Sequence, residues 1–257
     1  MQPTDLFDSY AKDYQNNFIK NPLAEYQRSI VHEIIRPCLS PQKKVLDVGC
    51  GPGADFDFYK SLSLNIDAID ISREMVKAAR QQAKRLGLNV RIARSAIVDF
   101  VPDIKYDIVI MNFGVVNAID NLEESLKTLS RIMAKDGLLF IVSMPPVHIF
   151  SFKADFLFFR FFKLYNRLFQ HKAITQEGFI FKYYTFRDFK NYFRLEQRNN
   201  LCSILPSPQQ FANSSFAQKW TKLFIKLDKK LCGVIPSFFG ADHIVYKMSV
   251  KSLENNN

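Results

Sequence analysis

The sequence predicts an α/β protein with a doubly wound sheet, and three observations lead to this fold class. Apolar segments of strand length alternate with segments of helical periodicity along residues 44–143. Gly49, Gly51 and Gly53 directly follow the first predicted strand. The length of 257 residues is that of one α/β domain with material left for insertions. We therefore expect a single domain over residues 1–257, with its ligand beyond the carboxyl ends of the strands.

Two helices are predicted ahead of the first strand, within residues 1–40. Residues 4–20 carry aromatic and alanine side chains at helical spacing, and Asn21-Pro22 ends that pattern. A second apolar face runs over residues 23–37, before prolines break the chain. These helices lead into the first strand of the sheet.

The predicted cofactor-binding core spans residues 41–144. It begins with a strand at 44–48 and the glycine loop, followed by a helix over about 54–62 and a second strand at 65–69. Asp70 stands at the tip of that second strand. A carboxylate at this place can accept charge-assisted hydrogen bonds from both hydroxyls of a ribose.

The following elements continue the alternation. Ser72 is a suitable cap for a helix over 74–86, which Gly87 ends. A third strand is expected at 90–93. The fourth, at 106–111, is almost uniformly apolar, as in a strand that is covered on both faces, and it is therefore predicted to be central.

A further helix and strand complete the core. Asp120 and Glu123 resemble a capping box and predict a helix that runs to Ala134. Gly137 is expected to end the loop before a fifth strand at 138–143. Five strands, each followed by a helix, indicate right-handed crossovers.

The pattern changes after the fifth strand, where insertions are predicted at 145–184 and 203–240. Residues 150–193 contain 17 aromatic side chains in 44 residues, and a helix expected over 150–171 has only a narrow polar stripe. This composition suits a lid over a substrate cleft, an interfacial helix on a membrane or lipid substrate, or a dimer contact.

The last elements return to the sheet. A helix is expected at 185–193, a sixth strand at about 195–202, an amphipathic helix around 216–231 and a final strand at 243–250.

The positive charge is concentrated in the second half of the chain. The formal net charge is +10; residues 152–190 carry eight Lys or Arg against three Asp or Glu, and residues 213–240 carry five against one. A basic surface favours anionic partners such as nucleic acid, acidic head groups or anionic substrates, without choosing among them.

Neither metal binding nor secretion is indicated by the sequence. The four cysteines lack the spacing of a zinc site or a disulfide framework. The first residues form no apolar signal segment, and no apolar run approaches the roughly 18 residues of a membrane span. We expect a cytoplasmic protein, and the basic and aromatic insertions leave peripheral contact with an anionic membrane open.

The glycine loop fits two classes of nucleotide-bearing cofactor. Gly49-x-Gly51-x-x-Ala54 matches the loose dinucleotide pattern, and an NAD-dependent oxidoreductase is therefore one reading. Asp47, two residues before the first glycine, favours the other reading, because a carboxylate there suits a cationic ligand and would repel a pyrophosphate. With this acid and the loop sequence Gly-Cys-Gly-Pro-Gly, the chain resembles the class I S-adenosylmethionine-dependent methyltransferases.

The resemblance implies a fold and a cofactor. The fold is a Rossmann-like, seven-stranded sheet whose last strand is antiparallel and inserted between strands five and six, with helical insertions that cover the substrate. The cofactor is S-adenosylmethionine, and the acid before the glycine loop would face its ammonium group. The residues that it would contact follow the tips of four strands: Asp47, Gly49, Cys50, Gly51, Gly53, Asp70, Ile71, Met75, Ser95, Ala96, Ile97, Asn112 and Phe113.

One position departs from the family's pattern. An Asp that holds the adenine amino group is usual after strand three, whereas this chain has Ser95. The Ser95 hydroxyl, the backbone of Ala96 and Ile97, or a shifted Asp99 could take that role. At the tip of strand four, the resemblance implies that backbone carbonyls of Asn112 and Phe113 hold the ammonium group.

The expected activity is methyl transfer to a small, apolar or amphiphilic acceptor. His148 and Tyr14 are the candidates for a general base. The strand-four tip, Asn112-Phe113-Gly114-Val115, lacks the Asn-Pro-Pro-Tyr run of nucleic-acid amino-methyltransferases, and no acidic metal cluster is visible. A small-molecule substrate, which includes lipid-like molecules, is therefore preferred over nucleic acid. A non-catalytic, membrane-associated cofactor-binding module is the remaining alternative.

Overall fold

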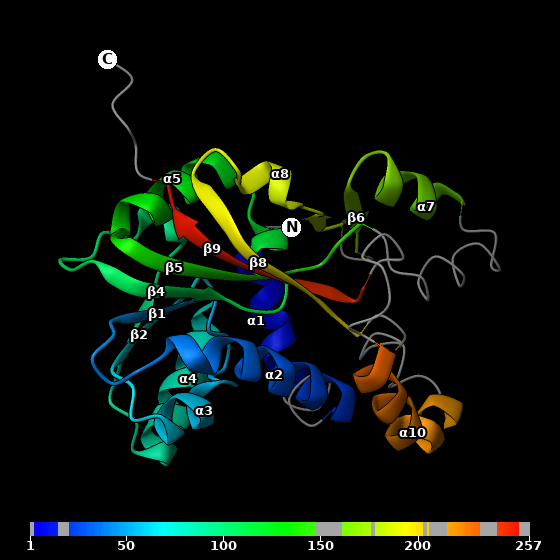
Figure 1. Ribbon diagram of the computed structural model, residues 1–257, viewed down its shortest axis with the longest axis horizontal. Coiled ribbons are helices and arrows are strands. Elements are labelled where there is room, and N and C mark those ends of the chain that lie inside the picture. Colours follow the sequence, from blue (N-terminus) through cyan, green and yellow to red (C-terminus); the bar gives the residue numbers. More distant parts are fainter. Residues whose placement is uncertain are drawn as a thin grey trace.

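The fold is a layered α/β structure around one large sheet (Figure 1). The computed structural model describes residues 3–14, 21–146, 161–175, 178–202, 205, 215–231 and 241–251. Seven strands form the sheet in the order β3-β2-β1-β4-β5-β9-β8. Their bounds are β1 (Val45–Val48), β2 (Ile66–Asp70), β3 (Val90–Arg94), β4 (Tyr106–Met111), β5 (Met133–Ser143), β8 (Phe193–Leu201) and β9 (His243–Val250).

The last strand has the expected direction and place. β9 pairs antiparallel with both β5 and β8, with Ile141 opposite Tyr246 and Arg198 opposite the same tyrosine. The first five strands pair in parallel. The predicted seven-stranded, doubly wound sheet with one antiparallel strand is therefore confirmed.

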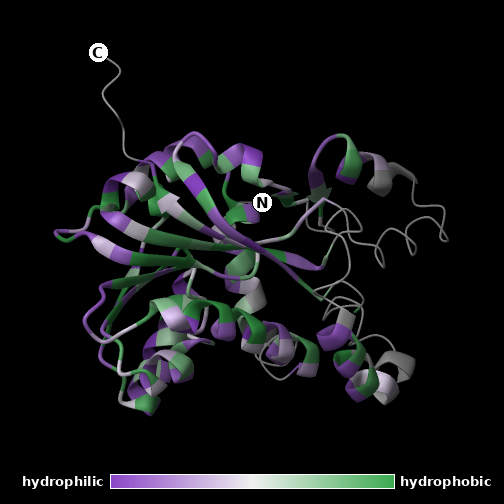
Figure 2. Cartoon of the chain, viewed as in Figure 1, coloured by the Kyte–Doolittle hydropathy of each residue, from purple (hydrophilic) through white to green (hydrophobic). Residues whose placement is uncertain are grey.

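Helices cover both faces of the sheet (Figure 1). The α-helices are α1 (Pro3–Tyr14), α2 (Pro22–Ile35), α3 (Phe56–Ser61), α4 (Arg73–Leu86), α5 (Leu122–Ile132), α7 (Phe161–Leu168), α8 (Phe186–Phe189) and α10 (Ser215–Leu231). One apolar core joins α2, α3 and α4 to the sheet, and the other joins α5 and α8 to the opposite face. In Figure 2 the central strands are mainly hydrophobic and β8 is largely hydrophilic, whereas the covering helices alternate hydrophobic and hydrophilic residues.

Several predicted element bounds need correction. The helix expected from Asp120 to Ala134 is α5, which ends at Ile132. Its cap is Asn121, whose side chain accepts a hydrogen bond from the Glu124 N–H at 3.2 Å. Gly137 lies within β5 rather than before it. Pairing with β4 explains this, because the paired segment already starts at Met133.

The connection after β3 also differs from the expected strand–helix alternation. It contains only the 3-10 turn η3 (Ile97–Asp99), so β3 and β4 are linked without an α-helix. The helix expected at 185–193 is the single turn α8, since β8 already begins at Phe193 and extends to Leu201.

The aromatic insertion is only partly helical where it is described. The helix expected over 150–171 appears as α7, Phe161–Leu168. A separate hairpin of β6 (Lys172–Ile174) and β7 (Ile180–Lys182), which the sequence did not predict, follows it. None of the helices in the described ranges has the length and apolar character that a membrane span requires.

Candidate functional site

The three loop glycines are required for different reasons. All have positive φ: 71° at Gly49, 54° at Gly51 and 81° at Gly53. A Cβ on Gly49 would lie 2.5 Å from a Val115 methyl, and one on Gly53 would lie 2.6 Å from the Phe56 ring. A Cβ on Gly51 would meet nothing within 4 Å. The first and third glycines therefore fit the loop against the protein, while the second borders open space where a ligand can approach the backbone.

Asp70 ties the glycine loop to the tip of β2. Its two carboxylate oxygens accept from the Gly51 N–H and the Ser72 N–H, both at 2.9 Å. The carboxyl group is buried, and burial raises its pKa while these backbone N–H groups act in the opposite direction. The sequence-predicted ribose acid thus lies directly beside the one loop glycine with free space.

Asp8 on α1 extends this arrangement. Its carboxylate accepts from the Ser72 hydroxyl and, at 3.2 Å, from the Glu74 N–H at the start of α4. The hydrogen bond with Ser72 is the largest cause of the lowered pKa of Asp8. The contact places α1 over the β2 tip. The sequence showed only an acid in a helix, with no signal for its partner 64 residues away.

Asp47 lies deeper than Asp70. It is buried at the end of β1 and accepts from the Tyr59 hydroxyl at 3.2 Å. Burial raises its pKa well above the usual range, and the neighbouring carboxylates of Asp55 and Asp70 add to this effect. A cation that binds nearby would favour the ionised form of Asp47.

Asn112 and Asp55 form a buried pair at the tip of β4. The Asn112 amide Nδ2 donates to Asp55 Oδ2 at 2.8 Å. The other amide atom, Oδ1, is buried and has no hydrogen-bond partner within the described part of the chain. Unpartnered buried acceptors are uncommon, and one at a strand tip beside a glycine loop is suited to a ligand donor.

Two basic residues of α2 complete the surroundings of Asp55. Its Oδ1 accepts from Arg28 at 3.1 Å and lies 2.8 Å from His32 Nε2. Burial alone would raise the pKa of Asp55, but Arg28, His32 and Asn112 outweigh it and lower the pKa well below the usual range. The sequence analysis did not predict the cluster of Asp55, Arg28 and His32. The available signal was the four-residue spacing of Arg28 and His32, which puts both on one helix face.

The turn after β4 has a special backbone. Phe113 has φ of 47° and Gly114 has φ of 81°, and the Gly114 N–H donates to the Val142 carbonyl at 2.9 Å. The Arg28 guanidinium lies 5.1 Å from the centroid of the Phe113 ring. A non-glycine residue in the left-handed region is costly, and such strain is often found at ligand sites.

The segment expected to meet adenine follows β3. The Ser95 N–H donates to the Asp70 carbonyl at 3.0 Å, and the Ser95 hydroxyl donates to the Ala96 carbonyl at 2.9 Å. The Ile97 side chain belongs to the core. Ser95 and Ala96 are half-buried, as is Ile71 at the β2 tip, whereas Asp99 is exposed.

Other predicted residues are buried or lie outside the description. Met75 and Cys50 are buried, and burial raises the pKa of the Cys50 thiol. Tyr14 ends α1, but its side chain lies outside the described residues, as does all of His148.

Asn117 fastens the aromatic insertion to the sheet. Its Oδ1 accepts from the Met144 N–H at 2.8 Å, and its Nδ2 donates to the carbonyls of Met144 and Lys182. The side chain therefore holds the end of β5 beside the β6–β7 hairpin.

Comparison with known proteins agrees with this geometry. Residues 45–137 match the family model described as a methyltransferase domain. This match and the relatives below support the predicted resemblance to the class I S-adenosylmethionine-dependent methyltransferases. S-adenosylmethionine is the cofactor of this family.

The sequence relatives match only part of this chain. The chain is 32% identical over 115 residues to the "Probable (S)-tetrahydroprotoberberine N-methyltransferase 2" of Papaver bracteatum, which is 43% of this chain and 32% of the relative. It is 28% identical over 101 residues to the ubiquinone biosynthesis O-methyltransferase of Pelagibacter ubique, 39% of this chain and 42% of the relative. The chain thus spans about a third to a half of the length of the curated relatives it matches.

Solved structures extend the likeness to nearly the whole fold. The N-methyltransferase NodS of Bradyrhizobium japonicum, in complex with S-adenosyl-L-homocysteine, aligns with a TM-score of 0.63 at 10% identity, over 97% of this chain and 99% of NodS. An S-adenosylmethionine-dependent methyltransferase of Clostridium acetobutylicum aligns with a TM-score of 0.58 at 13% identity, over 95% and 98% of the two chains.

Proposed function

We propose that this methyltransferase transfers a methyl group from S-adenosylmethionine to a small apolar or amphiphilic acceptor. The observation that carries the proposal is the pairing, at neighbouring strand tips, of two features. One is the open backbone at Gly51 beside Asp70, and the other is the unpartnered acceptor Asn112 Oδ1. The first suits a nucleoside and the second suits an ammonium group.

Each part of the cofactor has a candidate partner. Asp70 would accept from the ribose hydroxyls, and the half-buried segment Ser95–Ala96, with Ile71, would border the adenine. Asn112 Oδ1 would accept from the ammonium group, with the Asp47 carboxylate supplying negative charge nearby. The remaining predicted contacts would act through backbone or shape, because their side chains are absent, buried or, at Phe113, half-buried: Gly49, Cys50, Gly53, Met75, Ile97 and Phe113.

The charge around Asn112 supports this assignment. Asp55 is held ionised by Arg28 and His32, so it accepts and does not donate. The Asn112 group that faces it must then be the amide NH₂, which leaves the carbonyl oxygen for the ligand. In this way Asp55 acts as a positioning residue for an acceptor that the cofactor would use.

The chemistry requires mainly positioning. When bound, S-adenosylmethionine supplies an activated methyl group on a sulfonium, which is transferred in one in-line displacement. Holding the acceptor about 3 Å from the methyl group can account for roughly 7 to 11 kcal/mol of barrier lowering. His148 and Tyr14 stay predictions as bases for an acceptor that must lose a proton.

The acceptor class is inferred from what surrounds the cofactor region. On α1, Asp8 contacts the start of α4, and the Phe7 ring lies 6.1 Å from that of Phe179 beside β7. The helix therefore bridges the cofactor side and the aromatic insertion. We infer that residues 1–40 and the insertions 145–184 and 203–240 together cover an apolar acceptor, with residues 41–144 as the cofactor-binding core.

Calorimetry with S-adenosylmethionine and S-adenosylhomocysteine tests cofactor binding. Asp70→Ala removes the ribose acceptor and Gly51→Arg fills the open space, so each variant should lose measurable affinity. Asp57→Ala, an exposed acid on α3, is the matched control and should bind like the wild type. Unchanged affinity in both site variants would refute the proposed site.

The acceptor is identified by a second experiment. Incubation with methyl-labelled S-adenosylmethionine and fractionated cell extract should label a small, organic-soluble product. Label found only in RNA or protein would contradict the acceptor class. Strong cofactor affinity with no labelled product in any fraction would contradict the proposed enzyme activity.

A further inference from the structure

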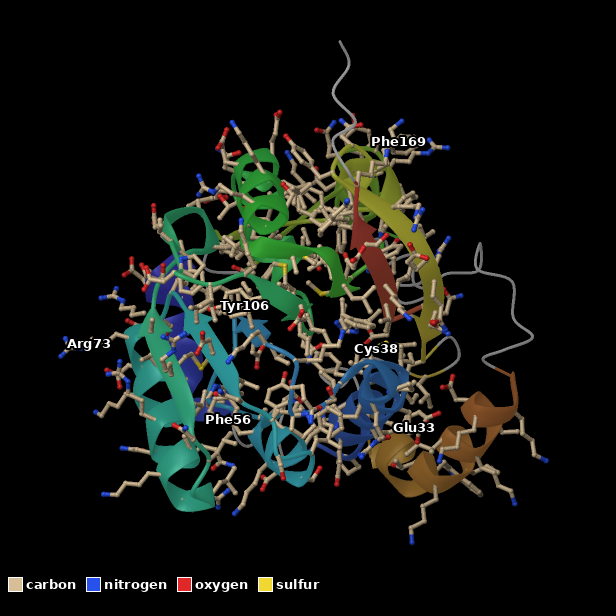
Figure 3. All side chains as sticks on the ribbon, turned by 60° about the vertical axis from the view of Figure 1, so that its left-hand side comes forward. Glu33, Cys38, Phe56, Arg73, Tyr106 and Phe169 are labelled. Carbon is tan, nitrogen blue, oxygen red and sulfur yellow. The ribbon has the colours of Figure 1, made fainter. Side chains whose placement is uncertain are left out.

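Exposed apolar side chains are concentrated on the two insertions. Among the described residues, nine large hydrophobic side chains are exposed. Only two of these nine, Val98 and Val101, belong to the cofactor-binding core. The other seven lie within 161–182 and 215–231: Tyr165, Phe169, Ile174, Ile180, Trp220, Leu223 and Leu227. Figure 1 shows α7 and α10 at the same end of the molecule, and Figure 3 shows Phe169 at the periphery.

One face of α10 fixes this helix to the protein. Ile225 packs against the buried cluster that includes Leu23 and Tyr26. Asp228 is buried and accepts from the Tyr26 hydroxyl at 3.2 Å. The Lys229 ammonium lies 5.6 Å from the centroid of the same tyrosine ring. The helix is therefore anchored on α2 through its inner face.

A second face of α10 is apolar and exposed. Trp220, Leu223 and Leu227 are 41%, 46% and 38% exposed. Spacings of three and four residues place these side chains on one stripe of the helix. In Figure 2, α10 carries both hydrophobic and hydrophilic bands.

Lysines border this stripe. Helix α10 contains five lysines and one acid, and that acid, Asp228, is turned to the inside. Lys222, Lys226 and Lys230 are exposed and four residues apart, so they form a row along the helix beside the apolar stripe. The outer surface of α10 thus combines a tryptophan–leucine stripe with lysines that no exposed acid of the same helix balances.

We propose that α10 docks on an anionic lipid surface. An interfacial helix of this kind buries its apolar stripe at the boundary of head groups and acyl chains, while lysines attract acidic head groups. A second copy of the chain fits less well, because it would bring two rows of lysines together. Nucleic acid would use the lysines but not the leucines. Docking does not depend on the proposed methyl transfer.

The chain carries its own reporter for this contact. Trp220 is the only tryptophan of the sequence, and it lies on the stripe. Adding vesicles of phosphatidylglycerol and phosphatidylcholine at low salt should shift its emission to the blue, and bromine-labelled acyl chains should quench it. Vesicles of phosphatidylcholine alone should bind at least about tenfold more weakly, because they offer the lysines no acidic head groups.

Variants separate the two parts of the surface. Leu223→Glu with Leu227→Glu should abolish the shift and the quenching, and Lys222→Glu with Lys226→Glu should lower partition at least about tenfold. Lys84→Glu with Arg85→Glu, exposed on α4, reverses equal charge elsewhere and should leave binding unchanged. Binding of S-adenosylhomocysteine, measured in parallel, reports that each variant is folded.

Several outcomes would overturn docking on lipid. One is an emission that anionic vesicles leave unchanged; another is a leucine double variant that binds vesicles like the wild type. A concentration-dependent dimer that the same leucine variant dissociates, without vesicle binding, would assign the stripe to self-association. Salt-sensitive RNA binding that the lysine variant loses, again without vesicle binding, would assign the surface to nucleic acid.

Discussion

Asn112 donates its side-chain amide to Asp55 over 2.8 Å, and its carbonyl oxygen stays buried without a partner in the described structure. The orientation of one amide therefore depends on a carboxylate 57 residues away. Because Arg28 and His32 keep that carboxylate ionised, the acceptor of Asn112 is prepared before any ligand arrives. This preparation reduces what a bound ammonium group has to reorganise.

The first prediction concerns the part of the cofactor that Asn112 recognises. Asn112→Ala should weaken S-adenosylhomocysteine binding by about 10- to 100-fold, since a hydrogen bond to a charged group contributes roughly 1.5–3 kcal/mol. Binding of 5′-methylthioadenosine, which lacks the amino-acid part, should change little. Calorimetry with both ligands measures the difference.

Asn65→Ala is the control for this variant, because Asn65 is exposed before β2. It should bind both ligands like the wild type. Equal losses for the two ligands in Asn112→Ala would mean that the residue supports the fold of the site and not the ammonium group.

The second prediction concerns acid stability. The pKa of Asp55 is lowered in the folded state, so its ionised form stabilises the fold above the unfolded pKa of about 3.9 and loses this effect as pH falls toward the folded pKa. Asp55→Asn should lower the free energy of unfolding by about 3 kcal/mol at pH 7, because the buried carboxylate that pairs with Arg28 and His32 is lost. The difference should shrink below about pH 4. Urea denaturation at pH 7, 5 and 3 measures it.

Asp57→Asn on the exposed face of α3 provides the comparison and should show no such pH dependence. A stability loss in Asp55→Asn that is constant from pH 7 to pH 3 would contradict the assignment of charge to Asp55.

The third prediction concerns Asp47, where function and stability oppose each other. Burial raises its pKa, so ionisation costs stability once the pH exceeds about 3.9. Asp47→Asn can still accept from Tyr59 and should raise the melting temperature at pH 7.5 by about 2–4 °C, while it weakens S-adenosylhomocysteine binding. Scanning calorimetry and titration calorimetry measure the two effects.

Asp67→Asn provides the opposite case. Burial raises the pKa of Asp67, but hydrogen bonds from Arg91 and Tyr106 outweigh it and lower the pKa, so this variant should melt earlier. If both variants melt earlier than the wild type, the charge of Asp47 is not a cost to the fold.

The fourth prediction separates the roles of the glycines. Gly49→Ala should destabilise the protein by about 1–3 kcal/mol beyond the backbone strain, since its Cβ meets Val115. Gly51→Ala meets no atom and should cost only the left-handed backbone, about 1–2 kcal/mol, while it weakens cofactor binding. Melting temperatures and S-adenosylhomocysteine affinities distinguish the two.

Gly87→Ala is matched to Gly51→Ala, because Gly87 has φ of 61° and equally free space at the end of α4. Its stability loss should be similar, with unchanged affinity. Loss of affinity in Gly87→Ala as well would mean that destabilisation alone weakens binding.

The sequence was sufficient for features encoded over a few residues. The glycine loop, the acid before it and Asp70 at the next strand tip predicted the cofactor family, because the backbone at a strand tip needs particular residue types there. The alternation of strands and helices predicted the sheet, and the resemblance to the family implied the place of its antiparallel strand. The same local patterns misplaced the start of α5 and missed the β6–β7 hairpin, where pairing and capping partners decide the bounds.

The tertiary structure decided which distant side chains meet. Arg28 is 27 residues from Asp55, Asn112 is 57 residues from it, and Asp8 is 64 residues from Ser72. No local periodicity encodes such pairs, since each depends on how α1, α2 and β4 pack around the β1 and β2 tips. By itself, the sequence determined the glycine loop and the class of cofactor that it predicts. Only packing decided which charges orient Asn112 and which helix lies over Asp70, because buried charges become specific through neighbours that folding brings together.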